Sequence, residues 1–266
     1  MRWRGAIRRS WARSCWGLQS LARYPRFAWR LVARPARVRL HGVLLPVGAD
    51  ATAAHRRELF AERYERGEAR CLLLRLAPDD VVLEIGAGLG FLSTLCALRV
   101  GSQRVTAVEA NPALLATIRA TWAANGVAPT LVHGVLARAP GEAELFVARE
   151  FASSSVLGEP ARGHAAERVA VRVPQLAVAE VFARVAPTCV VMDIEGGEAD
   201  LLPAIDWRGV RKLVLELHPH RIGEARAREL VALLEAQGFR EERGISSTRK
   251  KYFERSQGPA RAAGPR

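Results

Sequence analysis

The stretch that decides the fold is Val81-Val82-Leu83-Glu84-Ile85-Gly86-Ala87-Gly88-Leu89-Gly90. Its apolar half, Val81 to Ile85, predicts a short buried strand, and the segment Phe91 to Val100 that follows the glycines predicts a helix. Glycines between a strand and a helix allow a tight turn and let a ligand approach the backbone closely. We therefore predict a strand–turn–helix unit that binds a nucleotide at residues 81–100.

The spacing of the glycines narrows the class of ligand. A dinucleotide-binding Gly-x-Gly-x-x-Gly turn would need glycine at position 91, where the chain has Phe91. Glu84, two residues before Gly86, instead suits a cationic group such as an ammonium. Glu109 ends the next predicted strand, 19 residues after Gly90, where a carboxylate can accept both hydroxyls of a ribose. The alternative is an ordinary turn followed by a surface glutamate, and it accounts for the glycines better than for the two carboxylates.

Apolar and helical segments alternate on both sides of this unit. Further strands are predicted at Arg104 to Val108, Thr130 to His133, Cys189 to Ile194 and Lys212 to Leu217. Further helices are predicted at Ala54 to Arg75, broken only at Gly67, and at Pro112 to Asn125, Leu176 to Val185 and Ala225 to Gln237. Paired extended segments are expected at Val38 to Val47 with a turn at Gly42, at Glu142 to Val147 with Val169 to Val173 as a small edge hairpin, and at Phe239 to Gly244 with Lys251 to Arg255. Such alternation is typical of an α/β fold with a mostly parallel sheet and helices on both faces.

Charge is distributed unevenly along the 266 residues, whose formal net charge is +13. Residues 1–40 contain eleven Arg and no Asp, Glu or Lys, and residues 241–266 carry +4, which leaves −2 for residues 41–240. The near-neutral central part therefore gives no indication of nucleic-acid binding. We divide the chain into a basic arm (1–36), one α/β domain (37–256) and a disordered tail (257–266). The four cysteines lack metal-ligand spacing and indicate a reducing, cytoplasmic location.

Within the basic arm, apolar residues recur at helical spacing among the arginines, from Trp11 to Ala22. A basic amphipathic helix can lie on an anionic membrane surface, and an Arg-rich start without acidic residues also resembles a mitochondrial transit peptide. A solvated extension, or a start codon assigned too far upstream, explains the same residues. Since no apolar run approaches the roughly 18–20 residues of a spanning helix, we expect peripheral membrane contact at most.

A second acidic motif, Asp193-Ile194-Glu195-Gly196-Gly197-Glu198, closes the predicted strand that starts at Cys189. Ligands of open α/β sheets bind beyond the carboxyl ends of the strands, where the strand order reverses. Asp193 and Glu195 are therefore expected to face the ligand. Crowded carboxylates need a positive partner or shared protons, and a cationic ligand and a divalent metal ion are both candidates. Glu198 has the simpler interpretation of a residue that caps or solvates the start of the next helix.

Three further positions are candidates for the chemistry. His218 follows the strand Lys212 to Leu217 at the same edge of the sheet and is suited to proton transfer near neutral pH. A structural histidine at the strand end is the alternative interpretation. Tyr64 and Glu65 either close over a ligand or form a surface pair on an entry helix. Ser153-Ser154-Ser155 is either a substrate loop or a polar linker.

The chain resembles the S-adenosylmethionine-dependent class I methyltransferases and, more narrowly, the FkbM-type family. The resemblance covers roughly Val38 to Arg255 and is carried by the motifs Tyr64 to Glu68, Val82 to Phe91, Glu109 to Pro112, Ser153 to Ser155, Asp193 to Glu198, Glu216 to Pro219, and Tyr252-Phe253. It implies a Rossmann-like fold with a mostly parallel seven-stranded sheet and S-adenosyl-L-methionine as the cofactor. It also implies O-methylation of a hydroxyl on a sugar or a secondary metabolite.

With this resemblance the candidate residues fall into three groups. The expected cofactor-binding residues are Glu84, Gly86, Ala87, Gly88, Gly90, Glu109, Asn111, Gly134, Val135 and Asp193. The expected catalytic residues are Asp193, Glu195 and His218, and the expected substrate-contacting residues are Tyr64, Glu65 and Ser154. No residue is assigned as a metal ligand. The expected partner is a small-molecule or glycan hydroxyl, without specific nucleic acid.

The sequence also leaves alternatives to a methyltransferase open. A nicotinamide-dependent oxidoreductase shares the fold class, although the glycine spacing disfavours it, and an aminopropyl transferase could use the same loop. Base amino-methyltransferases carry an Asn/Asp-Pro-Pro-aromatic motif where this chain has Asp193 to Gly196. A cytosine-C5 enzyme needs an exposed nucleophilic cysteine, whereas Cys189 lies in an apolar strand. A non-catalytic binding module tethered by the basic arm is the rival outside enzymes.

Overall fold

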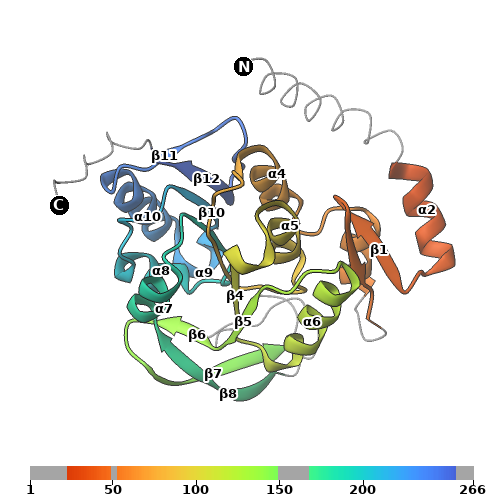
Figure 1. The fold of residues 1–266 in the computed structure, drawn as a ribbon, viewed down its shortest axis with the longest axis horizontal. Coiled ribbons are helices and arrows are strands. Elements are labelled where there is room, and N and C mark those ends of the chain that lie inside the picture. The colour runs from red at the N-terminus through yellow and green to blue at the C-terminus, as the bar shows by residue number, and fades with distance from the viewer. Residues whose placement is uncertain (1–22, 49–52, 149–167, 256–266) are drawn as a thin grey trace.

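A computed structural model of the chain describes residues 23–48, 53–148 and 168–255 (Figure 1). Its main sheet has seven strands in the order β11-β12-β10-β9-β3-β4-β5. The strands are β3 (Val82–Ile85), β4 (Val105–Glu109), β5 (Thr130–His133), β9 (Cys189–Met192), β10 (Lys212–Glu216), β11 (Arg240–Glu241) and β12 (Lys250–Glu254). The strands from β10 to β5 are parallel, and β12 is antiparallel to both of its neighbours. The predicted Rossmann-like, mostly parallel sheet is confirmed, and its strand order reverses between β3 and β9.

Apolar side chains alternate along the central strands and form one hydrophobic cluster on each face of the sheet. Val82 and Val191 belong to the first cluster, whereas their chain neighbours Leu83 and Val190 belong to the second. The first face is covered by α4 (Arg66–Arg75), α5 (Phe91–Val100) and α6 (Leu115–Ala124), and the second by α7 (Val178–Val185) and α10 (Glu224–Ala236). Since successive side chains of a strand point to opposite faces, these strands are buried on both sides, as their unbroken apolar runs predicted.

Short helical turns join the strands to the longer helices. They are η1 (Ser102–Arg104), η2 (Pro112–Leu114), α8 (Glu198–Leu201), η3 (Leu202–Ala204) and α9 (Pro219–Ile222). Pro112 stands at the first helical position, as predicted, and Asn111 Oδ1 accepts the backbone N–H of Ala113 at 3.0 Å. The expected helix from Pro112 to Asn125 is thus η2 followed by α6.

A three-stranded sheet lies beside the main one, along the lower side of Figure 1. It contains β6 (Val135–Ala137), β7 (Gly141–Ala148) and β8 (Arg168–Ala177), with β7 antiparallel to β8. The predicted hairpin is confirmed, but its expected place at the edge of the main sheet is wrong. Gly134, with φ 147°, lets the chain leave β5 and enter β6, and a Cβ there would lie 2.7 Å from the carbonyl oxygen of Pro174. The helix expected from Leu176 begins only at Val178, because β8 extends to Ala177.

The predicted helix from Ala54 to Arg75 is two helices, α3 (Ala53–Phe60) and α4. Residues 61–65 separate the two helices, so the predicted break at Gly67 is wrong. Glu62 and Glu65 have left-handed backbones, with φ 57° and 43°. Gly67 lies in the first turn of α4, where a Cβ would be 2.6 Å from Cδ of Lys250. The glycine therefore makes room for a lysine from β12 and does not interrupt the helix.

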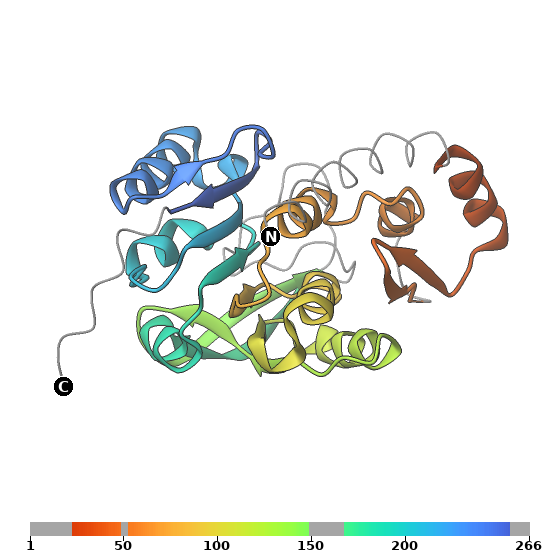
Figure 2. The same cartoon turned by 45° about the horizontal axis from the view of Figure 1, so that its top comes forward.

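The N-terminal elements pack at one end of the molecule. Figures 1 and 2 both place α2 (Arg23–Ala33) far from α10, next to the hairpin of β1 (Arg37–Leu40) and β2 (Val43–Pro46) that was predicted around Gly42. Arg30 of α2 donates to the carbonyl of Phe60 at 2.8 Å and pairs with Glu62. Residues 1–22, with the predicted helix from Trp11 to Ala22, lie outside the described residues, as do Ser153 to Ser155 and the tail.

Two further observations concern the described residues as a whole. Cys71, Cys96 and Cys189 are buried free thiols, as predicted, and burial raises their pKa values. Among the described helices, none is long and apolar enough to cross a membrane.

Candidate active site

A cavity of about 930 Å³ opens at the carboxyl ends of the parallel strands, where the strand order reverses. Of the predicted cofactor residues, six line it: Gly86, Gly88, Glu109, Gly134, Val135 and Asp193. Glu84, Ala87, Gly90 and Asn111 are buried and do not line it. Asp193, Glu195, Tyr64 and Glu65 also line the cavity, whereas His218 does not, and Ser154 lies outside the described residues.

The glycine loop is held tightly against the neighbouring strands. The N–H of Gly86 donates to the carbonyl of Val108 at 2.9 Å, and its φ of 88° is unfavourable for residues with a Cβ. A Cβ on Gly86 would lie only 2.0 Å from the carbonyl oxygen of Asp193, and one on Gly88 would lie 2.7 Å from Oη of Tyr64. The two positions therefore need glycine because backbone and side chains from β9 and the α3–α4 connection lie against them.

Glu109, at the end of β4, is anchored by backbone N–H groups. Its Oε2 accepts the N–H of Gly88 at 2.9 Å and its Oε1 accepts the N–H of Asn111 at 2.8 Å. Burial raises the pKa of Glu109, while these backbone donors act in the opposite direction. A carboxylate has about four acceptor sites, so Glu109 retains capacity to accept ribose hydroxyls from the cavity that it lines.

Glu84, at position three of β3, is a buried carboxyl without a positive partner. Its residue is 1% exposed, and neither carboxylate oxygen has a hydrogen-bond partner among the described residues. Burial raises the pKa of Glu84 to about 8, the nearby Ser93 acts in the opposite direction, and the neighbouring Glu109 adds to the shift. An unpartnered buried carboxyl is unusual in a native fold, and a cationic ligand group bound nearby would stabilise its charged form.

Tyr64 and Glu65 reach the cavity from the connection between α3 and α4. Tyr64 Oη accepts the N–H of Leu89 at 3.3 Å, which joins this connection to the glycine loop. Burial raises the pKa values of both residues. Both residues are half-buried and line the cavity, so they do not form a pair on the outer surface of an entry helix.

An acidic cluster stands opposite the glycine loop, where β9 and β10 end. Asp193 follows β9 directly, and His218 Nε2 lies 3.6 Å from its Oδ1 and 3.7 Å from Oε2 of Glu195. His218 Nδ1 lies 2.7 Å from Oε1 of Glu198, whose side chain is fully buried. Glu198 starts α8, as predicted, but the expectation that it caps or solvates the helix start is wrong: its carboxylate accepts from the imidazole.

The balance of charges in this cluster is uneven. Burial and the neighbouring Glu216 raise the pKa of Asp193 to about 8. Burial opposes the charged imidazole, yet the hydrogen bond to Glu198 and the nearby carboxylates raise the pKa of His218 overall. Arg221 pairs with Glu195 at 3.1 Å. Asp193 has only the imidazole as a positive neighbour within ion-pair distance among the described residues.

Sequence reasoning missed Glu216 and Lys250 as site residues. Both line the cavity, and Lys250 Nζ bridges Glu216, at 2.7 Å, and the buried Glu68. Glu216 could have been found, because it ends the strand next to β9 as Glu109 ends the strand next to β3. Lys250 could not be found, because it comes from the antiparallel strand β12. The sequence alone does not show which residue of β12 pairs with which residue of β10.

A family model described as the methyltransferase FkbM domain matches residues 80–241. The chain belongs to this family. The domain is accordingly an S-adenosylmethionine-dependent methyltransferase domain, and the oxidoreductase alternative is set aside. The residues present fit this cofactor: Gly86, Gly88 and Glu109 line the cavity, and Glu109 keeps capacity to accept ribose hydroxyls.

Individual relatives match this FkbM domain over short stretches. Ribosomal RNA small subunit methyltransferase A of Kineococcus radiotolerans is 49% identical over 70 residues, 26% of this chain and 23% of that protein. Ribosomal protein L11 methyltransferase of Geobacter metallireducens is 36% identical over 84 residues, 32% of this chain and 28% of that protein. The chain thus spans about a quarter of the length of these curated relatives. A solved precorrin-6y C5,15-methyltransferase of Geobacter metallireducens aligns with 80% of this chain and 94% of its own, at 17% identity and a TM-score of 0.45.

Proposed function

We propose that this protein transfers a methyl group from S-adenosylmethionine to a hydroxyl oxygen of a sugar or a comparable oxygen-rich metabolite. One observation carries the proposal: the glycine loop with Glu109 and the acidic pair Asp193 and Glu195 line the same cavity of about 930 Å³. A cofactor held at the loop and an acceptor held at the acidic side would share one cavity.

The bound cofactor supplies an electrophilic methyl group on a sulfonium. Gly86, Gly88 and Glu109 line the part of the cavity that would hold it, and Glu109 would accept hydrogen bonds from its ribose. Alignment of the acceptor oxygen with the methyl carbon is a large part of catalysis in such a displacement. The acceptor proton passes to the carboxylate of Glu195, which lines the cavity, because Asp193, with a pKa raised to about 8, already holds a proton near neutral pH. His218 holds a positioning role behind them, since its ring is buried and does not line the cavity.

The acidic side also favours an oxygen-rich acceptor. Carboxylates accept hydrogen bonds from several hydroxyls at once, and Asp193, Glu195 and Glu216 all line the cavity. A cationic amine is the competing acceptor, because negative side chains attract it as well. The two acceptor classes are separated by experiment.

The test is transfer of labelled methyl from S-adenosylmethionine to a panel of hydroxylated glycans, polyols and matched amino sugars. We expect label on an ether oxygen, and Glu195→Gln should lower the rate by about 10²-fold or more, the contribution of a general base. Cofactor affinity should change by less than about threefold, and Glu180→Gln on the exposed face of α7 should leave both unchanged. Label on nitrogen alone, or no transfer by a protein that binds the cofactor, would contradict the proposal.

We also propose that the N-terminal arm contacts an anionic membrane surface. The side chains of Trp29 and Val32 on α2 are 62% and 87% exposed, in a region of eleven arginines without acidic residues. Exposed apolar residues among arginines suit the boundary of anionic lipid. Trp29→Ser/Val32→Ser should release the protein from phosphatidylcholine vesicles that contain anionic phosphatidylserine, whereas Leu98→Ser, on the exposed side of α5, should not. Equal vesicle binding by both variants would contradict this contact.

A further inference from the structure

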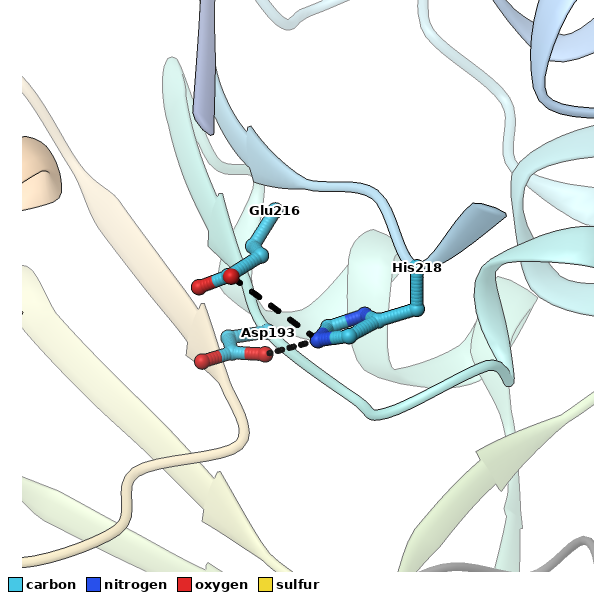
Figure 3. Close-up of side chains that lie close together, drawn as sticks. All are labelled: Asp193, Glu216 and His218. Atoms are coloured by element: carbon cyan, nitrogen blue, oxygen red, sulfur yellow. Dashed lines mark ion pairs between the residues drawn. The ribbon is translucent and has the colours of Figure 1, made fainter. Parts of the chain in front are cut away.

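The ends of β9 and β10 bring three potential metal ligands together. Figure 3 shows Asp193 and Glu216 pointing toward the imidazole of His218, each from its own strand end. Nε2 of His218 lies 3.6 Å from Oδ1 of Asp193 and 3.9 Å from Oε1 of Glu216. All three ligand atoms lie within 4.8 Å of one another. Parallel pairing of β9 with β10 fixes this proximity, because Met192 and Leu215 are opposite each other in the register.

The imidazole is fixed with Nε2 toward this cluster. Its side chain is 4% exposed, and Nδ1 lies 2.7 Å from Oε1 of the fully buried Glu198. With Nδ1–H donated to Glu198, Nε2 presents its lone pair to Asp193 and Glu216. A carboxylate behind a histidine is the usual way in which proteins orient a histidine that ligates a metal. The closest carboxylate oxygens to Nε2 lie beyond hydrogen-bond distance, at 3.6 Å or more.

Two carboxylates of the cluster are paired with an arginine or a lysine, and Asp193 is not. Glu216 is paired with Lys250 and Glu195 with Arg221. Oδ1 of Asp193 is buried and has no hydrogen-bond partner among the residues that the structure describes. A buried carboxylate oxygen without a partner is costly, so a proton or a cation is needed there.

We propose that Asp193, Glu216 and His218 bind one divalent cation, which holds the oxygen of the acceptor at the acidic side of the cavity. Ligand atoms about 2.1 Å from one ion are at most about 4.2 Å apart. Both histidine–carboxylate separations meet this limit. The two carboxylates lie within 4.8 Å of each other, and a small movement of either side chain closes the set around an ion. The donor set of one imidazole and two carboxylates suits Mn²⁺ or Zn²⁺ better than Ca²⁺. Asp193 and Glu216 line the cavity, so the remaining positions of the ion face the acceptor.

The inference rests on the proposed function only for the role of the ion. When Asp193 is a ligand, Glu195 is the carboxylate that takes the acceptor proton. Binding of the ion itself needs neither cofactor nor acceptor, and it can therefore be measured separately.

The experiment is a titration of the chelator-treated full-length protein with Mn²⁺ alone, followed by electron paramagnetic resonance and calorimetry, with Zn²⁺ and Mg²⁺ in parallel. We expect one saturable site per chain. Asp193→Asn, Glu216→Gln and His218→Asn should each abolish saturable binding or weaken it by at least tenfold. Glu198→Gln should weaken it by about 10–100-fold, the usual effect of removing the partner of a ligating histidine. Melting temperatures show which variants are folded, and Asp193→Asn, whose side chain is 29% exposed, keeps the test decisive if a buried variant fails.

The matched control is His220→Gln, whose ring lies 5.7 Å from that of His218 but outside the ligand set. It should bind Mn²⁺ as the parent does. The inference would be overturned if the folded protein bound none of Mn²⁺, Zn²⁺ and Mg²⁺ at one site per chain. It would also be overturned if folded Asp193→Asn bound the ion as tightly as the parent does. S-adenosylmethionine binding is titrated in the same samples. Cofactor binding without ion binding rejects the ion and keeps the proposed function, whereas ion binding without cofactor binding does the reverse.

Discussion

The two sides of the cavity are built in different ways. On the side of β3 and β4, backbone groups hold the site: Gly88 and Asn111 donate their N–H groups to Glu109. On the side of β9 and β10, charged side chains hold it. His218 lies among four carboxylates, of which two are paired with basic side chains: Glu195 with Arg221 and Glu216 with Lys250. Backbone-built sites depend on local sequence and bind a constant ligand part. Side-chain-built sites depend on residues far apart in sequence, and they are where an acceptor and an ion are selected.

The largest effect we predict concerns Glu84, the more deeply buried of the two carboxyls on the loop side. Between pH 4.5 and about 8, unfolded Glu84 is ionised while folded Glu84 keeps its proton, because burial raises its pKa to about 8. The folded state then binds more protons, so stability falls as the pH rises through this range. Glu84→Gln has no carboxyl to ionise, so its stability does not fall in this way. The loss in the parent is on the order of 5 kcal/mol, at about 1.4 kcal/mol for each unit of pKa shift.

The measurement is urea unfolding of cofactor-free protein at pH 5 and pH 8. The unfolding free energy of Glu84→Gln should exceed that of the parent by more at pH 8 than at pH 5. Glu180→Gln, an exposed carboxyl, should show no such trend. The same difference at both pH values would mean that Glu84 is not a buried acid without a partner.

The next effect, on the charged side, is the loss of a shared lysine. Lys250→Met leaves Glu68, 1% exposed, without its cation, and leaves Glu216, 7% exposed, with only the more distant Arg249 and His218 at 3.8 and 3.9 Å. Removing one partner of a buried ion pair costs about 3–5 kcal/mol, and we expect this loss of unfolding free energy in urea at pH 7. The neighbouring Lys251→Met breaks a single pair with Glu241 and should cost about 1 kcal/mol or less. Equal losses in the two variants would show that the charged side is held by packing alone.

A smaller effect is expected from overfilling the loop side. Gly86→Ala places a Cβ 2.0 Å from the carbonyl oxygen of Asp193, at φ 88°. Overpacking costs about 1–3 kcal/mol and positive-φ strain about 1 kcal/mol, so we expect about 2–4 kcal/mol in urea unfolding. Gly223→Ala has nearly the same φ, 86°, with nothing within 4 Å, and should show the strain alone. If both variants lose the same free energy, the contact between loop and β9 is not tight.

The loop side could be predicted from sequence because its ligands lie close together in the chain. Glu84, Gly86 and Gly88 stand within five residues, and Glu109 follows one strand later, so the period of strands and helices alone places them. The central strands β3, β4, β9 and β10 followed from their apolar runs, since strands buried on both faces leave a strong signal. The count of seven strands was implied by the family resemblance.

The remainder depends on tertiary contacts that leave no local signal. The break before Glu65 follows from two left-handed residues without a Gly or Pro between them. The separate sheet of β6, β7 and β8 follows from the turn at Gly134. Lys250 reaches the site through antiparallel pairing that brings it opposite Glu216, 34 residues away.

The most direct test of the account is calorimetric titration of purified protein with S-adenosylmethionine, run beside folded Glu109→Ala. The parent should bind one equivalent, and the variant should bind about 10–100-fold more weakly, because hydrogen bonds to a charged group contribute about 1.5–3 kcal/mol. Equal affinity in the folded variant would contradict the role of Glu109. A folded parent that binds NAD and not S-adenosylmethionine would contradict the assignment of the whole cavity.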